Sequence, residues 1–298
     1  MIEYYKRRLK DKSIQKLKRF SVGCWINVYD LSEKEIKFLS RTFRLSEQNL
    51  LSGLDQDEVP RIDKDGGIYI YMRALTKNKE LTTFLVILNE KFVLTLSKVK
   101  TSVVERLINR NVYTTQRFKF LLNILSELNK EFESYTLEIA KSVRKSIKKV
   151  GVLTEKEVNS LLQKEEALNN LIFYYHNMLI LYNRILKNIK FYEQDKDIIN
   201  DLIVEATEGF NTCKNTLKTV SNIRNYYMIS LSNRLNKVIN LLTLITILIS
   251  IPSAVSGIYG MNIRLPLQSN PLAFYYILVF ILLVWVGFIL YLSKKKIF

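Results

Sequence analysis

The stretch VINLLTLITILISIPSAVSGIY (238–259) is 22 residues long and carries no charged side chain. The tripeptide GMN (260–262) follows it, then a nine-residue link (263–271), then a second uncharged stretch of 21 residues, LAFYYILVFILLVWVGFILYL (272–292). A helix of about 20 apolar residues is long enough to cross a bilayer. The sequence therefore predicts a membrane protein whose two C-terminal spans form a hairpin.

The basic residues near the two spans predict the orientation of the hairpin. Arg234 and Lys237 precede the first span and three lysines (294–296) follow the second, whereas the link carries Arg264 alone. Since cytoplasmic flanks are enriched in Lys and Arg, we expect a multi-pass protein of the cell (inner or plasma) membrane with both termini in the cytoplasm. The start, MIEYYKRRLKDK, lacks the apolar core of a signal peptide, which agrees with a cytoplasmic N-terminus.

The region before the spans changes character near residue 110. CWINVY (24–29), GGIYIYMRALT (66–76) and TTFLVILNEKFVLTLS (82–97) are rich in β-branched and aromatic residues, with a hairpin tip expected at Asn89-Glu90-Lys91. Between the first two, Ser32 is a candidate N-cap for a helix. Later residues are charged and have helical spacing, broken near Gly151, and no Gly or Pro occurs between Gly209 and Pro252, which permits about 42 helical residues.

These patterns predict an α+β membrane protein in which a long stalk helix is continuous with the first transmembrane helix. The expected parts are a cytoplasmic α/β domain (1–110), long cytoplasmic helices including the stalk (111–235), the stalk end and first transmembrane helix (236–260), an extracellular loop (261–271), the second transmembrane helix (272–292) and a basic cytoplasmic tail (293–298).

Composition argues against several classes of function. The formal charge is +17, from 45 Lys and Arg against 28 Asp and Glu, but no nucleic-acid recognition motif accompanies it, so we expect no nucleic-acid partner. Cys24 and Cys213 are far apart, and the single histidine, His176, stands on an apolar helix pattern, so a zinc cluster or disulfide framework is not expected. The sequence has no nucleotide-binding loop or catalytic constellation, so we expect no enzyme.

A line of polar residues runs along the first span. Its members follow at steps of three and four and so lie along one side of a helix: Asn236, Asn240, Thr243, Thr246, Ser250 and Ser253. We call this set the polar stripe. An unpaired amide or hydroxyl in hydrocarbon is unfavourable, so the stripe must face other protein or water.

Two interpretations of the polar stripe remain open from the residues alone. Ser, Thr and Asn commonly join transmembrane helices by hydrogen bonds, which is one of them. In the other, first helices from several chains surround a pore, because a two-helix hairpin cannot enclose one. A neutral, oxygen-lined pore suits Mg²⁺, which holds its waters tightly and prefers oxygen ligands.

The tripeptide at the end of the first span fits the pore interpretation. Gly260 lets the backbone turn at the helix end, Met261 is adaptable apolar filler, and Asn262 offers its carbonyl to an incoming ion. An ordinary helix C-terminus that uses Gly as a terminator is the alternative.

The sequence closely resembles the CorA family of magnesium transport proteins over nearly the whole chain. The resemblance rests on YGMN (259–262) between the spans, SNRLN (232–236) before the first span, the lysine-rich end SKKKIF and an N-terminal run beginning WINVYDLSEKEIKFL (25–39). It implies a homopentamer with a cytoplasmic funnel domain, an inner ring of pore helices and an outer ring of second helices. The selectivity filter would be Gly260, Met261 and Asn262.

The resemblance also implies roles for particular residues. The implied pore-lining positions are Asn236, Leu242, Ser250, Ser253 and Asn262, with Leu242 as a hydrophobic constriction. A regulatory Mg²⁺ site between neighbouring funnels would include Asp201, with Glu205 and Glu208 nearby. The alternative is that these three carboxylates belong to a solvated helix face.

Two departures from the family pattern and two alternative functions leave the function open in detail. The loop carries Arg264 where family members often have acidic residues, and Ser250 stands where many have methionine. Transport of Co²⁺, Ni²⁺ or Zn²⁺ is one alternative to Mg²⁺ uptake, although residues 236–262 contain no His or Cys. An alternative of another class is a membrane-anchored scaffold without ion flux.

Overall fold

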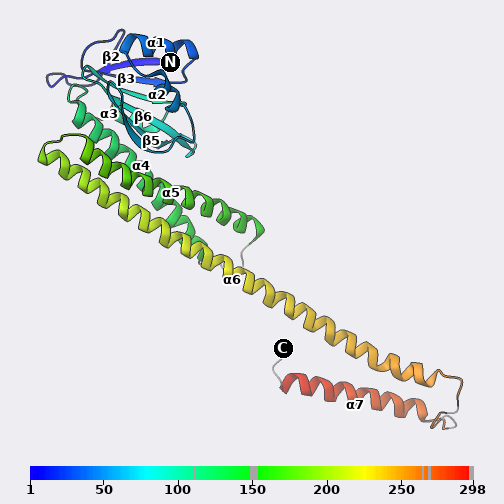
Figure 1. The fold of residues 1–298 in the computed structure, drawn as a ribbon. Helices are drawn as coiled ribbons and strands as arrows, with labels where there is room; N and C mark the ends of the chain where they lie inside the picture. The colour runs from blue at the N-terminus through cyan, green and yellow to red at the C-terminus, as the bar shows by residue number, and fades with distance from the viewer. Residues whose placement is uncertain (111, 148–153, 264, 268–269, 295–298) are drawn as a thin grey trace. The chain divides into compact units, whose positions relative to one another are not determined.

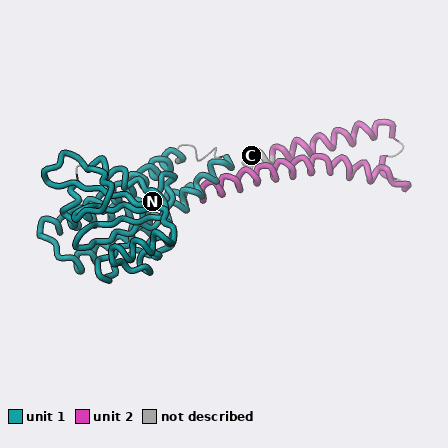
Figure 2. The backbone as a smooth tube through the Cα atoms, turned by 90° about the horizontal axis from the view of Figure 1, so that it is seen from above, with its two compact units in different colours: residues 1–223 teal, residues 224–298 magenta. Residues whose placement is uncertain are grey.

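The computed structural model describes residues 1–110, 112–147, 154–263, 265–267 and 270–294 (Figure 1). The chain divides into two compact units, residues 1–223 and 224–298, which Figure 2 colours separately. The long helix α6 (Glu193–Tyr259) contributes its first part to unit 1 and its remainder to unit 2, where α7 (Ala273–Lys294) follows.

A single mixed sheet organises the N-terminal part of unit 1. Its strands are β1 (Ile2–Lys6), β2 (Gln15–Leu17), β3 (Cys24–Tyr29), β4 (Arg61–Lys64), β5 (Ile68–Leu75), β6 (Leu81–Leu88) and β7 (Phe92–Ser97). They lie in the order β2-β1-β3-β7-β6-β5-β4, and β3 and β7 pair in parallel while the other neighbours are antiparallel.

The strands expected from the sequence are confirmed, and three further strands join them. β3 coincides with the predicted strand at 24–29, β5 lies within 66–76, and 82–97 divides into the hairpin β6–β7, in which the N–H of Asn89 donates to the carbonyl of Phe92 at 3.0 Å. β1, β2 and β4 contain several charged or amide side chains, and their apolar residues are too few for a recognisable alternation.

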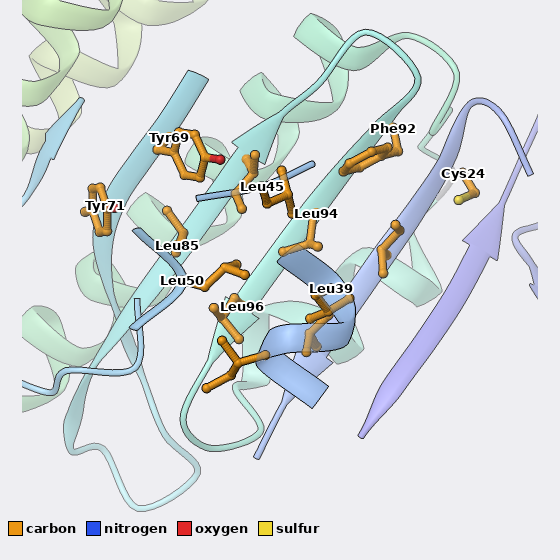
Figure 3. Packing of buried hydrophobic residues seen from close by; sticks show 14 residues of the cluster. Cys24, Leu39, Leu45, Leu50, Tyr69, Tyr71, Leu85, Phe92, Leu94 and Leu96 are labelled. Atoms are coloured by element: carbon orange, nitrogen blue, oxygen red, sulfur yellow. The ribbon is translucent and has the colours of Figure 1, made fainter. Parts of the chain in front are cut away.

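Helices cover both faces of the sheet. On one face, α1 (Glu33–Phe43) and α2 (Glu47–Ser52) bury Leu39 and Leu50 against strand residues such as Leu94 (Figure 3). Ser32 is the N-cap of α1, and the carboxylate of Glu35 accepts from the Ser32 N–H and hydroxyl at 2.9 Å each, which confirms the predicted helix start.

The opposite face meets the helical part of unit 1. Trp25 of β3 packs its ring 5.2 Å from that of Phe120, and its indole N–H donates to the Thr95 hydroxyl at 2.8 Å. Phe120 belongs to α4 (Arg117–Ile147), which follows α3 (Ser102–Asn109) and precedes α5 (Glu155–Asn188). The break expected near Gly151 lies outside the described residues.

The first part of α6 completes the helical core. The helix as a whole is longer than the sequence indicated. The helix begins at Glu193, passes through Gly209 without interruption, and continues beyond Pro252 to Tyr259. Gly209 is needed for packing, because a Cβ there would lie 2.4 Å from Cζ of Tyr175. The Tyr175 hydroxyl in turn lies 3.1 Å from that of Thr136, so Gly209 admits a buried hydrogen-bonded ring.

Unit 2 is a hairpin of the last part of α6 and α7, which runs back along it (Figure 2). The α6 face beside α7 is half-buried and apolar, and consists of Leu244, Ile247, Leu248, Ile251, Pro252 and Val255. Most other apolar side chains of unit 2 are exposed. Among the described residues, α6 and α7 are the two helices long and apolar enough to cross a membrane.

Candidate functional site

The polar stripe lies on the face of α6 that points away from α7. All six members, from Asn236 to Ser253, are exposed, whereas Leu248 and Pro252 on the other face are half-buried. Leu242 is 63% exposed beside the stripe. The hairpin partner therefore does not cover the stripe.

The four hydroxyls of the stripe share one hydrogen-bonding pattern. Each donates to the carbonyl four residues earlier: Thr243 to Ile239 at 2.9 Å, Thr246 to Leu242 at 2.9 Å, Ser250 to Thr246 at 2.6 Å and Ser253 to Ile249 at 2.9 Å. A hydroxyl has one proton to donate and two lone pairs. Because the proton is used inside the helix, each hydroxyl presents only acceptor capacity outward.

The GMN tripeptide begins where α6 ends. The N–H of Gly260 donates to the Ser256 carbonyl at 2.9 Å, and that of Met261 to the Ile258 carbonyl at 3.2 Å, so hydrogen bonding to the last turn continues to Met261. Among the described residues the positive-φ glycines are Gly23 and Gly66, so Gly260 is not a left-handed helix terminator. Asn262 is exposed directly after this turn.

The loop after the tripeptide is partly described. The Tyr259 hydroxyl donates to the Pro266 carbonyl at 3.4 Å, a weak contact between the helix end and the loop. Arg264, whose charge departs from the family pattern, lies outside the described residues, as do Lys295 and Lys296 of the basic tail.

An apolar cavity of about 270 Å³ opens between the end of α6 and the start of α7. It is lined by Val255, Ile258, Tyr259, Leu267, Tyr276, Ile277 and Phe280. The lining has no charged group, and its polar side-chain atoms are the hydroxyls of Tyr259 and Tyr276.

The three acidic residues of the expected regulatory site lie on α6 in unit 1. Asp201, Glu205 and Glu208 are all exposed. The Glu205 carboxylate accepts from the side-chain amide of Asn129 on α4 at 2.8 Å, so it is engaged within its own protomer. In the described part of one chain, no three His, Cys, Asp or Glu side chains are grouped to hold a metal ion.

One interaction of unit 2 was not foreseen from the sequence. Pro252 occupies the middle of a transmembrane-length helix, and the indole N–H of Trp285 on α7 donates to the carbonyl of Leu248 at 3.1 Å. A signal for this pair does exist, since a proline inside a helix frees the carbonyl four residues before it.

A comparison with protein-family models identifies the family of this chain. The family model for the CorA-like Mg²⁺ transporter protein matches residues 21–295, which include most of the α/β domain, the stripe and the GMN tripeptide. The chain belongs to this family.

Individual members of the CorA family are similar to the chain along almost its whole length. The cobalt/magnesium transport protein CorA of Methanocaldococcus jannaschii is 25% identical over 293 residues, which cover 91% of this chain and 90% of that protein. The complete structure of the CorA magnesium transporter from the same organism has a TM-score of 0.84 at 19% identity and covers 99% of this chain and 98% of that one.

A second solved structure extends the comparison. The full-length CmaX protein matches with a TM-score of 0.73 at 14% identity, over 96% of each chain. At such identities the likeness establishes the fold. The predicted CorA family membership and the order of the fold, from α/β domain through long helix to C-terminal apolar helix, are therefore confirmed.

Proposed function

We propose that this chain is the subunit of a homopentameric Mg²⁺ channel of the cell membrane, with both termini in the cytoplasm. An inside-negative potential drives uptake, since each positive charge gains about 2.3 kcal/mol per 100 mV. Membership of the CorA family supports transport of a divalent cation. The pore interpretation is supported by the polar stripe, whose hydroxyls present only hydrogen-bond acceptors outward. We call this the acceptor pattern, and it is the observation that carries this proposal.

The acceptor pattern matches the outer surface of a hydrated Mg²⁺ ion. Mg²⁺ dehydrates reluctantly and keeps its octahedral waters, whose hydrogens point away from the metal. The hydroxyls of Thr246, Ser250 and Ser253 donate their protons to the helix backbone and offer lone pairs to those hydrogens. A stripe of this kind binds the ion through its waters without stripping them.

Several chains must contribute to the pore, because one exposed stripe on a two-helix hairpin encloses nothing. Five copies of α6 would close a ring with the stripe and Leu242 inside, and Asn240 and Asn236 toward the cytoplasmic end. A ring of Asn262 carboxamides at the mouth, set by Gly260 and Met261, would then form the selectivity filter. Neutral carbonyls hold the hydrated ion weakly enough to release it.

The filter is tested by Mg²⁺ entry into proteoliposomes under an inside-negative potential. Because a hydrogen bond to a charged group contributes on the order of 1.5–3 kcal/mol, Asn262→Ala should lower uptake by about tenfold or more. Equal uptake by both proteins would remove Asn262 from the mechanism. No uptake by either would favour the membrane-anchored scaffold.

The stripe is tested by removing one hydroxyl at constant shape. Thr246→Val removes a hydroxyl oxygen that would accept hydrogen bonds from the ion's waters, so this change should reduce uptake. Thr219→Val is the matched control, because the Thr219 hydroxyl makes the same bond to the carbonyl four residues earlier, at 3.0 Å, outside the apolar segment. A similar loss in both variants would contradict a pore-facing stripe.

Cytoplasmic Mg²⁺ is proposed to close the channel by bridging funnels at Asp201 and Glu208. Both carboxylates are exposed on α6 and within helical spacing of each other, whereas Glu205 is held by Asn129 and contributes less. Asp201→Ala should let current persist at internal Mg²⁺ concentrations that close the native channel. Unchanged closure would eliminate Asp201 as a sensor.

Co²⁺ is the second candidate cargo, because the similar protein of Methanocaldococcus jannaschii is a cobalt/magnesium transport protein. The stripe and filter contain no His or Cys, which disfavours a site that strips and binds softer ions such as Ni²⁺ or Zn²⁺ directly. Competition between Mg²⁺ and Co²⁺ in the same proteoliposomes ranks the two.

A further inference from the structure

Pro252 leaves one backbone carbonyl of the pore helix without its usual partner. In an α-helix the N–H of residue 252 would bond to the carbonyl of Leu248, but proline has no N–H. Both residues are half-buried on the α6 face that lies against α7. In a hydrocarbon environment an unpaired carbonyl is strongly unfavourable, so this position requires a donor from elsewhere.

Trp285 supplies that donor from the middle of α7. Its indole N–H lies 3.1 Å from the Leu248 carbonyl oxygen. Trp285 is 12 residues after the first residue of α7, Ala273, which corresponds to about 18 Å along the axis, near the centre of a bilayer of ordinary thickness. Tryptophan is usually placed at the membrane surface, where its N–H reaches water.

The two groups therefore satisfy each other. The indole N–H at this depth needs an acceptor, and the Leu248 carbonyl needs a donor in place of the N–H that proline lacks. The bond also fixes the one place where the backbone ladder of α6 is interrupted. Beyond it the helix continues through Ser253 to Tyr259 and leads into the GMN tripeptide.

We propose that Trp285 is a positioning residue for the pore helix: by donating to the carbonyl that Pro252 frees, it sets the direction of the α6 segment that carries Ser253 and ends at Asn262. The role in ion passage rests on the proposed function. The bond and its dependence on Pro252 do not, so the two are tested separately.

The functional test is a double-mutant cycle in proteoliposomes with Trp285→Phe, Pro252→Ala and the combination. Trp285→Phe removes the donor and keeps an aromatic ring, and interhelical hydrogen bonds in membranes predict a reduction of Mg²⁺ uptake of about threefold to tenfold. In the Pro252→Ala background residue 252 again has an N–H for Leu248, so the further loss caused by Trp285→Phe should fall below about twofold. Equal losses in both backgrounds would overturn the proposal, because the ring's bulk alone would then matter.

A second readout separates positioning from a general loss of folded protein. Fewer folded channels lower the maximal uptake and leave the half-saturating external Mg²⁺ concentration unchanged. A misdirected filter raises that concentration, so Trp285→Phe should raise it in the native background and not in the Pro252→Ala background. A lower maximum alone would reject the positioning role.

The hydrogen bond itself is tested without any flux measurement. With ¹⁵N-labelled tryptophan in lipid bilayers, the indole proton of Trp285 should resonate downfield of free indole in a hydrocarbon solvent, with the hydrogen-bonded Trp25 as internal reference. Replacing Trp285 by its sulfur isostere benzothienylalanine, which keeps the shape and lacks the N–H, should lower the thermal stability more in the native background than in the Pro252→Ala background. A free-indole shift, or an equal effect in both backgrounds, refutes the bond even in a protein that conducts nothing.

Discussion

Unit 1 and unit 2 use the same apolar side chains in opposite ways. In unit 1, leucines such as Leu94 in the sheet are fully buried, and the buried indole N–H of Trp25 is paired with the hydroxyl of Thr95. In unit 2, leucines such as Leu242 remain exposed, and the polar stripe on the same helix is exposed as well. Unit 1 buries apolar side chains within one chain, whereas the exposed apolar surface of unit 2 requires lipid or further copies of the chain around it.

The contrast also concerns backbone hydrogen bonding. A sheet of seven strands in residues 1–97, all of which the structure describes, pairs its strands with one another. In the hairpin, each helix provides its own bonds, and the one carbonyl that Pro252 frees is met by Trp285. Since water cannot repair a missing bond inside a bilayer, unit 2 tolerates fewer unpaired groups than its open packing implies.

The largest predicted difference between the units comes from truncating a leucine. Leu94→Ala empties space in a closed core and should reduce the free energy of unfolding by about 2–5 kcal/mol. Leu242→Ala should leave protomer stability near the native value and alter ion flux instead. Thermal and denaturant unfolding of the full chain in detergent measures both, and a large stability loss from Leu242→Ala would show that this leucine packs within one protomer.

The next difference concerns a methyl group added to a helix glycine. In Gly209→Ala the new Cβ meets the ring of Tyr175, so overpacking should destabilise unit 1 by about 1–3 kcal/mol. The matched variant Gly257→Ala places its Cβ where no atom lies within 4 Å, and its protomer stability should not fall. Loss of the oligomer in Gly257→Ala would show that a neighbouring subunit fills that space.

A smaller difference is a pH effect confined to unit 1. Burial raises the pKa of Glu131, whose carboxylate lies 3.0 Å from Arg106 but is poorly aligned with it for a hydrogen bond. A carboxyl whose folded pKa lies above its unfolded value stabilises fully below the unfolded value of 4.5 and loses this contribution as the pH rises through the folded pKa. Glu131→Gln should therefore gain stability relative to the native protein between pH 4.5 and neutrality, and the exposed Glu133→Gln should not.

The smallest expected difference between the units is in thiol reactivity, measured at one cysteine in each unit. Burial raises the pKa of Cys213 to about 11, so at neutral pH the thiol is protonated and should resist a water-soluble thiosulfonate reagent. A cysteine introduced by Ser250→Cys should react, because the proposed pore holds water. Mass spectrometry of the intact chain counts the modified thiols, and an unreactive Ser250→Cys would place the stripe against lipid or protein.

Much of this molecule was predictable from local sequence. Two uncharged stretches predicted the hairpin because the length of a span is fixed by bilayer thickness, and the strands at β3, β5, β6 and β7 followed from dense β-branched and aromatic residues. The polar stripe and the GMN tripeptide were visible as well, because a helix repeats every 3.6 residues whatever surrounds it. The family resemblance rested on the GMN tripeptide with Tyr259 before it, on SNRLN (232–236), on the lysine-rich end and on an N-terminal run.

Tertiary structure decided what depends on partners distant in the chain. β1, β2 and β4 are strands because neighbouring strands offer them bonds, and α6 passes through Gly209 because the ring of Tyr175 occupies the place of a side chain there. Glu205 is engaged within its own protomer because Asn129 of α4 reaches it. The bond from Trp285 to Leu248 joins residues 37 positions apart, and the proline that requires it does not specify the donor. Such pairings are set by packing in three dimensions, which local propensity does not encode.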